Sequence, residues 1–261
     1  MLSRLLPRRR PDPVPAQLPF GRRLYVIGDI HGRADLLDQL LAQIESDDAS
    51  RGNARTGIIF LGDLIDRGPD SAAVLEKVRT LCADRPDIRC LCGNHEEIFL
   101  AACDGDGDML RLLLRAGGME TLLSYGLDPD AIDRASIPEL VEMTVCAVPQ
   151  SHIAFLRSLE DYIQEGDYAF VHAGIRPGIA LDRQTARDLR WIRSPFLEHP
   201  RSHGMMVVHG HTITESVDER ANRIGIDTGA YRSGRLTALG LEAGERWVLD
   251  TAGGNRSLSE I

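Results

Sequence analysis

The sequence contains no stretch of about 20 apolar residues, the length that a membrane-spanning helix needs. Leu2, Leu5 and Leu6 are too few for the apolar region of a secretory signal, and three arginines follow them. These two absences argue against a membrane-spanning protein and against a secreted one. We therefore expect a cytoplasmic protein with no membrane partner.

Cysteine is scarce, and its spacing points to no known scaffold. The five cysteines are an odd number, and they form neither a CxxC pair nor a zinc-ribbon pattern. Cys90 and Cys92 alternate along one apolar run, so they are expected to face one layer. Reduced, buried thiols are the expected state, which fits a reducing compartment.

Positive charge is also in deficit. Lysine and arginine number 30 against 39 acidic residues, which gives a net charge of -9 and an isoelectric point near 5.4. Such a chain is not expected to bind nucleic acid as its main activity, whereas carboxylates are expected where divalent cations bind. Hydrophobic residues are 43% of the chain and charged residues 26%, which favours a packed core over disorder.

The exception to this acidic balance is the segment 1–23. It holds six arginines and one aspartate, so it carries +5 and the remainder carries -14. It also holds five prolines, and this composition predicts an extended, mobile arm. A solvated leader is the preferred interpretation over a basic docking arm.

Three apolar runs then share one layout, in which a glycine and polar side chains follow the run. Leu24–Gly28, Ile58–Leu61 and Ile88–Cys92 read as buried strands. Helical apolar stripes separate them, the first over Arg33 to about Ile44, with a loop from Ser46. Alternating strands and helices predict parallel strands with crossover helices, whose carboxyl ends gather functional groups.

The rest of the predicted domain, residues 24–250, is mixed. Residues 97–165 read as a mainly helical insertion near the active site. Two further strands are expected at Tyr168–Val171 and Met205–Val208. Asn222–Asp227, Arg235–Leu241 and Glu245–Leu249 read as antiparallel strands, and residues 251–261 as a C-terminal tail.

Polar residues with metal-binding side chains follow five of these strands. A lone Asp-x-His after a strand is usually a turn, but five such strand ends are hard to explain as turns. Oxygen and nitrogen ligands together suit Mn, Fe or Zn better than Ca, and a shared carboxylate, for which Asp63 is the natural choice, could bridge two ions. His211 is preferred over His209 as a ligand. The candidate ligands are Asp29, His31, Asp63, Asn94, His172 and His211.

The same loops contain groups suited to phosphoester hydrolysis. Arg67 lies beside the predicted metal loop and can bind phosphate oxygens in a bidentate manner. His95 adjoins Asn94 and can donate a proton to a leaving alkoxide, with Asp66 as the carboxylate that orients it. Trp191 and Trp247 are expected in the core.

These motifs carry a family resemblance. Gly28-Asp-Ile-His-Gly32, Gly62-Asp-Leu-Ile-Asp-Arg-Gly68 and Gly93-Asn-His-Glu96 resemble the signatures of the phosphoprotein phosphatase family of calcineurin-like metallophosphoesterases. His172-Ala-Gly and Gly210-His211-Thr resemble its later histidine motifs. The segments 115–126 and 191–193 resemble the bacterial serine/threonine phosphatase branch. The resemblance spans about Leu24 to Leu249.

The resemblance implies an α/β (α+β) fold, a β-sandwich flanked by helices with a dinuclear centre at one edge. One metal would be held by Asp29, His31 and Asp63, and the second by Asp63, Asn94, His172 and His211. His95 and Asp66 would form the acid dyad, with Arg67 and Arg193 binding phosphate. The two ions would be divalent, most commonly manganese, with iron or zinc as alternatives.

The implied reaction is phosphomonoester hydrolysis by a hydroxide that bridges two metals. A phosphorylated protein or a small phosphoester is the preferred substrate. The alternative is hydrolysis of a dinucleoside polyphosphate or a nucleotide at the same site. In the tetraphosphatase branch the second motif usually has alanine where this chain has Asp66, which favours the phosphatase. A non-catalytic binding module would require lost ligands, and none is lost.

Overall fold

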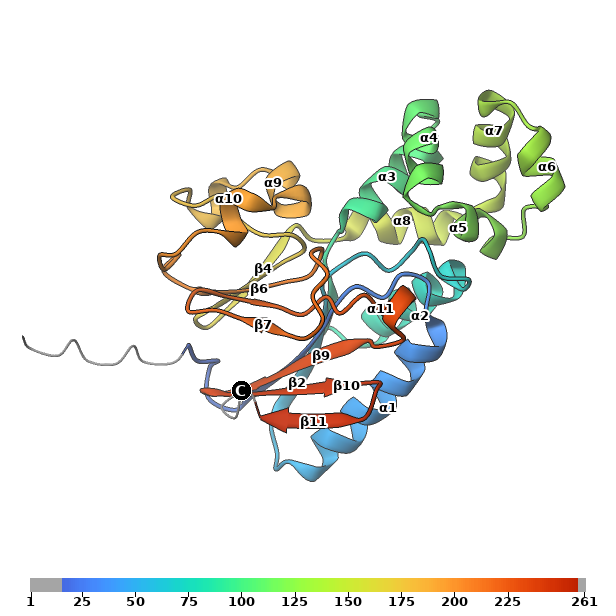
Figure 1. Cartoon of the computed structure of the whole chain (residues 1–261). Helices are drawn as coiled ribbons and strands as arrows, with labels where there is room; N and C mark the ends of the chain where they lie inside the picture. Colours follow the sequence, from blue (N-terminus) through green and yellow to red (C-terminus); the bar gives the residue numbers. More distant parts are fainter. Residues whose placement is uncertain (1–15, 258–261) are drawn as a thin grey trace, which may run out of the picture.

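The computed structural model describes residues 16–257, which form two facing β-sheets with helices on their outer sides (Figure 1). The predicted α/β (α+β) sandwich flanked by helices is confirmed. The first sheet has the order β11-β10-β9-β1-β2-β3. Its strands are β1 (Arg22–Ile27), β2 (Arg55–Phe60), β3 (Ile88–Cys90), β9 (Thr237–Glu242), β10 (Glu245–Asp250) and β11 (Gly254–Ser257).

The second sheet has the order β4-β5-β6-β8-β7. Its strands are β4 (Tyr162–Glu165), β5 (Tyr168–Val171), β6 (Met206–His209), β7 (Asp218–Glu219) and β8 (Arg223–Gly225). As predicted, β1, β2 and β3 are parallel, and β9 and β10 are antiparallel neighbours of that set. An antiparallel strand was expected at residues 222–227. Strand β8 is antiparallel to its neighbour β7, as expected, but parallel to its other neighbour β6, where the expectation is wrong.

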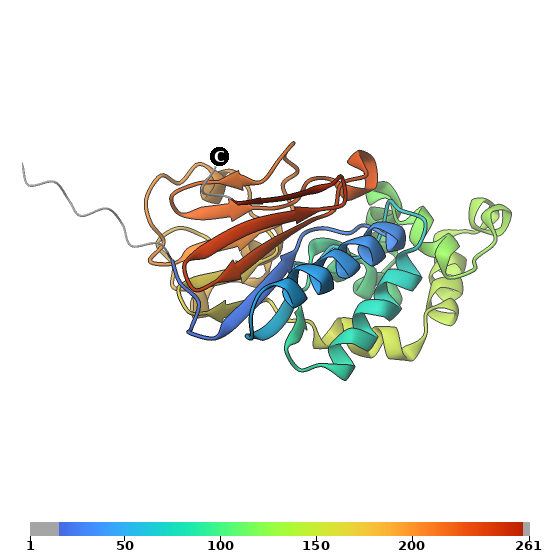
Figure 2. The same cartoon turned by 90° about the horizontal axis from the view of Figure 1, so that it is seen from below.

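Alternation along β1 places its side chains in two cores. Leu24 and Val26 pack between the sheets, together with Phe170 and Val208 of the second sheet. Tyr25 and Ile27 point the other way, into a core under the helices. Two crossover helices, α1 (Ala34–Ser50) and α2 (Ser71–Asp84), cover that outer face (Figure 2).

The helical section follows β3 and lies beside the sandwich, at the upper right of Figure 1. It comprises α3 (Asn94–Cys103), α4 (Gly107–Ala116), α5 (Met119–Ser124), α6 (Pro129–Arg134), α7 (Ile137–Ala147) and α8 (Gln150–Ser158). The predicted insertion over residues 97–165 runs too far, because residues 162–165 form strand β4. Within residues 16–257, every helix is too short or too polar to cross a bilayer.

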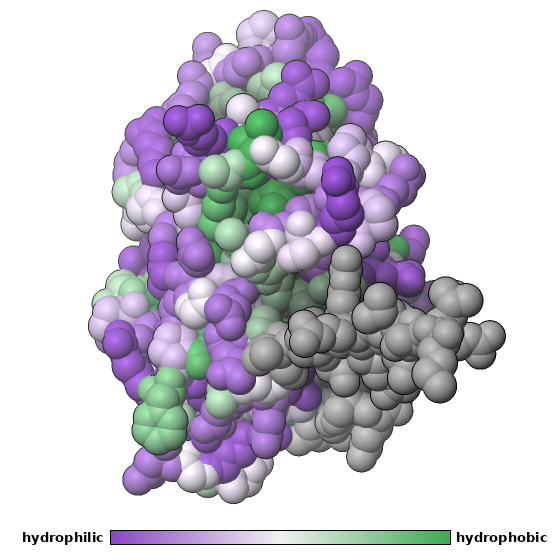
Figure 3. Space-filling model, turned by 90° about the vertical axis from the view of Figure 1, so that its left-hand side faces the viewer, coloured by the Kyte–Doolittle hydropathy of each residue, from purple (hydrophilic) through white to green (hydrophobic). Residues whose placement is uncertain are grey.

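Smaller helices complete the fold. The outer face of the second sheet packs against α9 (Ala186–Trp191) and α10 (Ser194–Leu197), after the 3₁₀ turn η1 (Leu181–Arg183), and α11 (Ala230–Ser233) precedes β9. The end of the sandwich away from the helical section is mainly hydrophilic, with a narrow band of apolar residues in its middle (Figure 3).

The predicted arm 1–23 ends too late. Residues 1–15 lie outside the described residues, but Leu18 is buried and its N–H donates to Ala243 O. Arg22 and Arg23 begin β1, and their guanidinium groups pair with Glu165 and Glu242 respectively. Burial of these arginines is possible because distant carboxylates neutralise them.

Two other predicted boundaries are wrong. Helix α1 continues to Ser50, through residues that were expected to form a loop. The predicted tail 251–261 includes β11, whose backbone pairs with β10 from Gly254 to Ser257. Trp247 lies in the core as expected, whereas Trp191 is 37% exposed and lies outside it.

Candidate metal centre

The candidate ligands lie where strands of both sheets end. Asp29 and His31 follow β1, Asp63 follows β2, and Asn94 starts α3 just after β3. From the second sheet, His172 follows β5 and His211 follows β6. Two groups of side chains, His31–Asp63–His95 and Asp63–His172–His211, each bring three possible ligand atoms within 4.8 Å of one another. Both groups share Asp63, the residue expected to bridge.

Backbone strain is concentrated in these loops. Six non-glycine residues within residues 16–257 have a positive φ, and five of them belong to the candidate site: His31, Asp63, Asp66, Arg67 and His211. The sixth, Ala243, lies in the turn between β9 and β10. Such conformations cost of order 1–3 kcal/mol each and persist where the surrounding structure enforces them. The loops therefore hold their side chains in orientations that the backbone alone would not choose.

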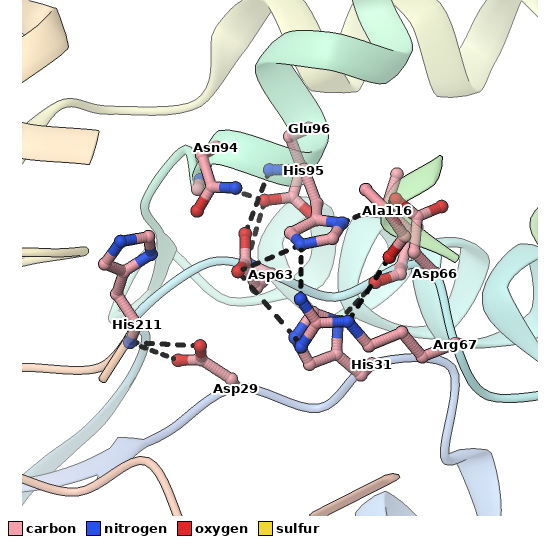
Figure 4. Close-up of polar contacts among 12 residues, drawn as sticks. Asp29, His31, Asp63, Asp66, Arg67, Asn94, His95, Glu96, Ala116 and His211 are labelled. Atoms are coloured by element: carbon pink, nitrogen blue, oxygen red, sulfur yellow. Dashed lines mark hydrogen bonds and ion pairs between the residues drawn. The ribbon is translucent and has the colours of Figure 1, made fainter. Parts of the chain in front are cut away.

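Asp63 lies at the centre of the site (Figure 4). Its Oδ2 atom is 3.4 Å from His172 Nε2, 3.8 Å from His31 Nε2 and 3.9 Å from His95 Nε2. Burial acts to raise the pKa of this carboxyl, but His172, His95 and His31 together bring it well below its usual value. Asp63 is therefore an ionised carboxylate with imidazole nitrogens on several sides.

Two of the candidate histidine ligands are held by backbone carbonyls in the tautomer that metal binding through Nε2 would require. Nδ1 of His31 donates to Ile65 O at 2.7 Å, and Nδ1 of His172 donates to Leu61 O at 2.8 Å. In a neutral ring this leaves Nε2 as the atom that could bind a cation. In this structure Nε2 of His31 instead accepts a hydrogen bond from Arg67 Nη1. Burial, as the largest cause, lowers the pKa of His31 to about 3 and that of His211 to about 3, so both rings are neutral near pH 7.

The polar atoms around this centre fit a cation. Among residues 16–257, His211 Nε2 is one of two buried side-chain nitrogen or oxygen atoms without a hydrogen-bond partner. His172 Nε2 lies 3.1 Å from Asn94 Oδ1, a contact between two acceptors unless the ring is protonated or a cation binds both. Burial, Asp227 and Asp63 raise the pKa of Asp29 well above its usual value. A divalent cation would relieve this repulsion.

Asp29 itself stands slightly apart from the two groups. Both oxygens of its carboxyl accept the backbone N–H of His211, at 3.2 and 3.0 Å. Gly210 must lack a side chain, because an added Cβ would collide with the Asp29 carboxyl. The loops after β1 and β6 are thus fastened together at this point, and Asp29 reaches the same edge as the other ligands.

Glu96 joins two other loops. It is fully buried, and its carboxyl oxygens accept the backbone N–H groups of Asp63, Leu64 and Gly93 at 2.8, 2.8 and 2.9 Å. The sequence showed Glu96 only as part of a motif. Its structural role is to hold the loop after β2 against the start of α3.

The two residues that were predicted to form an acid dyad are in contact. His95 Nδ1 lies 2.6 Å from Asp66 Oδ2, and both side chains are buried. Burial acts to lower the pKa of His95, but the negative charges of Asp63 and Asp66 raise it above its ordinary value. Arg67 lies between two imidazoles, with Nη1 2.9 Å from His31 Nε2 and Nη2 3.0 Å from His95 Nε2 (Figure 4).

Other predicted residues have more peripheral positions. Arg193 is exposed at the start of α10, and its charge helps to lower the pKa of His211. His209 is buried; its Nδ1 donates to Gly210 O and its ring packs edge-on against Phe196. It belongs to neither group of candidate ligands within residues 16–257, in line with the preference for His211.

Two residues near the centre were missed. The Tyr231 ring lies edge-on to His31, with centroids 5.4 Å apart, and the Arg67 guanidinium lies 4.7 Å from its centre. Asp227 is buried behind Asp29. Asp227 could have been found, because it ends a predicted strand as the other acidic ligands do. Tyr231 carried no comparable signal.

Comparison with known proteins agrees with this geometry. The sequence profile of the calcineurin-like phosphoesterase family matches residues 22–227. Serine/threonine-protein phosphatase 2 of Escherichia coli K12 is 30% identical over 230 residues, which cover 83% of this chain and 91% of that protein. A symmetrical bis(5'-nucleosyl)-tetraphosphatase of Cellvibrio japonicus is 34% identical over 182 residues, which cover 67% of this chain and 56% of that protein.

This chain therefore spans about half the length of the symmetrical tetraphosphatases, 44% and 56% in two cases. Among solved structures, one titled as a candidate diadenosine tetraphosphatase has a TM-score of 0.62 at 20% identity, covering 92% of this chain and 100% of that one. At that identity the likeness concerns the fold alone. With a matching profile over most of its length, this chain belongs to the calcineurin-like phosphoesterase family, as its motifs predicted.

Proposed function

We propose that this protein is a metal-dependent phosphomonoester hydrolase and, within that class, a serine/threonine protein phosphatase. The observation that carries the proposal is the buried contact of 2.6 Å between Asp66 and His95, beside the shared carboxylate Asp63. In this proposal His95 is not a metal ligand, so its imidazole, oriented by Asp66, is available for proton transfer. The leaving alkoxide of a phosphoserine needs a proton, and His95 is placed to supply it.

The ligands proposed for one cation are Asp29, His31 and Asp63, and those for the other are Asp63, Asn94, His172 and His211. Two divalent ions, for which we propose manganese, would lower the pKa of water and neutralise charge on the phosphoryl oxygens. Iron or zinc would suit the same mixture of oxygen and nitrogen ligands.

Arg67 has two tasks in this proposal. Its guanidinium now donates to His95 Nε2, so His95 can carry a proton on that atom only when Arg67 turns away. Phosphoryl oxygens are strong bidentate acceptors for arginine and would draw it away. Substrate binding would thus place Arg67 on the phosphate and free His95 to act as an acid. Arg193, exposed near His211, is the second proposed phosphate ligand.

A dinucleoside polyphosphate hydrolase is the second candidate, because several relatives carry that name. Asp66 counts against it, since the resemblance implies alanine at this position in the tetraphosphatase branch. The match that covers 91% of serine/threonine-protein phosphatase 2 also supports the first candidate. The five cysteines, all free, fit the reducing cytoplasm, where we propose that the enzyme acts.

The test is a matrix of metals and substrates. Purified protein is assayed with Mn²⁺, Fe²⁺ or Zn²⁺ against phosphoserine and phosphothreonine peptides, a phosphotyrosine peptide and diadenosine tetraphosphate. We expect Mn²⁺-dependent hydrolysis of the first two, and near-complete loss in Asp63→Asn. A strong preference for the dinucleotide would favour the second candidate. Bound metal without hydrolysis of any phosphoester would point to a binding module.

A further inference from the structure

The corner between α4 and α5, residues 116–124, lies against the turn that carries Asp66 and Arg67. This corner belongs to the helical section, some 50 residues further along the chain. Arg67 N–H donates to Gly117 O at 2.8 Å, and Arg67 Nε donates to Ala116 O at 3.4 Å. An added Cβ at Gly117 would lie 2.7 Å from Arg67 Cγ, so the approach requires glycine there.

Thr121 makes the central contact of this corner. Its hydroxyl donates to Asp66 Oδ1 at 2.6 Å and accepts the backbone N–H of Asp66 at 3.0 Å. Ser71 Oγ lies 3.0 Å from the same hydroxyl and also 3.0 Å from Asp66 N. Thr121, Asp66 and Ser71 are all fully buried, so water cannot replace a lost partner without opening the packing.

The two oxygens of the Asp66 carboxyl therefore have different partners. Oδ2 faces His95 Nδ1, and Oδ1 faces the Thr121 hydroxyl. A carboxyl held at both oxygens cannot rotate about its last side-chain bond, so the plane in which it meets the imidazole is fixed. Asp66 also has a positive φ of 70°, and the hydrogen bond from its N–H to Thr121 helps to hold this strained backbone.

We propose that Thr121 is a positioning residue for proton donation, acting through Asp66 on His95. This inference rests on the proposed phosphomonoester hydrolysis and adds a residue that touches neither substrate nor cations. The hydroxyl, and not merely the volume of the side chain, is the required feature. A consequence is that the helical section takes part in catalysis through its α4–α5 corner.

The leaving group distinguishes positioning from a general structural role. An alkoxide, such as the serine side chain, leaves only if it gains a proton, whereas p-nitrophenolate leaves readily without one. A defect in the acid dyad should therefore slow hydrolysis of a phosphoserine peptide far more than that of p-nitrophenyl phosphate. A defect in folding or metal binding should slow both reactions by the same factor.

The variants are Thr121→Val, which keeps the shape and loses the hydroxyl, and Thr121→Ser, which keeps the hydroxyl. Thr144→Val is the matched control: Thr144 is equally buried in α7, and its hydroxyl bonds only within its own helix, to Leu140 O at 2.7 Å. We expect Thr121→Val, with Mn²⁺, to lower kcat for the peptide about tenfold or more relative to its effect on p-nitrophenyl phosphate. Thr121→Ser and Thr144→Val should leave the ratio of the two rates unchanged.

Equal losses on both substrates, or no loss, in Thr121→Val would overturn the inference. If Thr121→Val does not fold, Thr121→Ala makes the same comparison. A changed ratio of the peptide and p-nitrophenyl phosphate rates in Thr121→Ser would also contradict the inference. A wild-type protein that hydrolyses p-nitrophenyl phosphate but no alkyl phosphate would contradict proton donation by His95, and this inference with it. If the wild type hydrolyses neither, the proposed function itself fails, a result separate from any effect of Thr121.

Discussion

Replacing Glu96 with glutamine tests how the chain keeps two metal-facing loops in register. The Oε2 atom of Glu96 accepts the N–H groups of Asp63 and Gly93, and Oε1 accepts that of Leu64. Two of these donors lie in the loop after β2 and one at the start of α3. A single buried side chain therefore sets the distance between the candidate ligands Asp63 and Asn94.

The cost follows from counting donors. Glutamine offers one carbonyl oxygen and one amide group in place of two acceptors. In the better of the two orientations of the glutamine amide, its carbonyl oxygen accepts the two hydrogen bonds that Oε2 accepted. Its NH₂ group then faces the Leu64 N–H, so two donors meet and the Leu64 N–H is left without an acceptor. One buried, unsatisfied donor costs about 1–3 kcal/mol. Glu96→Ala leaves three such donors and costs about 3–9 kcal/mol, a large part of the roughly 5–15 kcal/mol that stabilises a domain.

Urea unfolding of the metal-free protein measures this cost. We expect Glu96→Gln to lower the unfolding free energy by about 2 kcal/mol with an unchanged dependence on urea concentration, and Glu96→Ala to be poorly folded. Glu45→Gln, at an exposed position of α1, is the matched control and should change stability by less than about 0.5 kcal/mol. Unfolding of Glu96→Gln at the same urea concentration as the wild type would refute the assigned role.

Three further predictions concern the site and its surroundings. Arg67→Ala should lower kcat about 10²–10³-fold in steady-state assays, with Arg67→Lys in between; a wild-type rate in Arg67→Ala would exclude its role on phosphate. Mn²⁺ at about 100 times its Kd should stabilise the wild type by about 2.7 kcal/mol, seen as a higher Tm that EDTA reverses; an equal gain in Asp63→Asn would contradict the bridging role. His209 has a pKa lowered to about 4, mainly by burial and also by Arg223, so its contribution to stability is complete above its unfolded pKa of about 6.5 and lost as the pH falls towards 4. Between pH 7 and pH 5 the wild type should lose about 2 kcal/mol more than His209→Gln in unfolding experiments, and parallel losses would show that His209 does not carry this effect.

The sequence was most informative where chemistry leaves little choice of side chain. A dinuclear site needs carboxylate, imidazole and amide ligands, and parallel strands bring their carboxyl ends to one edge. Residues such as Asp63 and His172 could therefore be selected from their place after apolar runs, and the structure brings them together. Their roles as metal ligands remain predictions that the assays above address.

The sequence was least informative where a role depends on a partner far along the chain. Arg23 looked like part of a solvated arm, but Glu242, 219 residues away, neutralises it inside the first sheet. Thr121 lies in the segment 115–126 that resembles the phosphatase branch, but no role of its own could be read from the sequence, because its bond to Asp66 spans 55 positions. Trp191 was placed in the core from its size alone, yet its indole N–H donates to Glu97 at the surface. Such contacts follow from the tertiary fold and leave no local pattern.

The strained loops explain why the helical section and the sandwich form one unit. Asp66 and Arg67 are consecutive residues with φ near 70°, a conformation that costs of order 1–3 kcal/mol for each. Their N–H groups bond to Thr121, Ser71 and Gly117, and two of these three partners belong to the α4–α5 corner. Without that corner the turn would be free to relax to negative φ, which would move the Asp66 carboxyl from His95. Asp66 and Arg67 follow strand β2 of the sandwich, but their orientation depends on a corner of the helical section that contributes no candidate ligand.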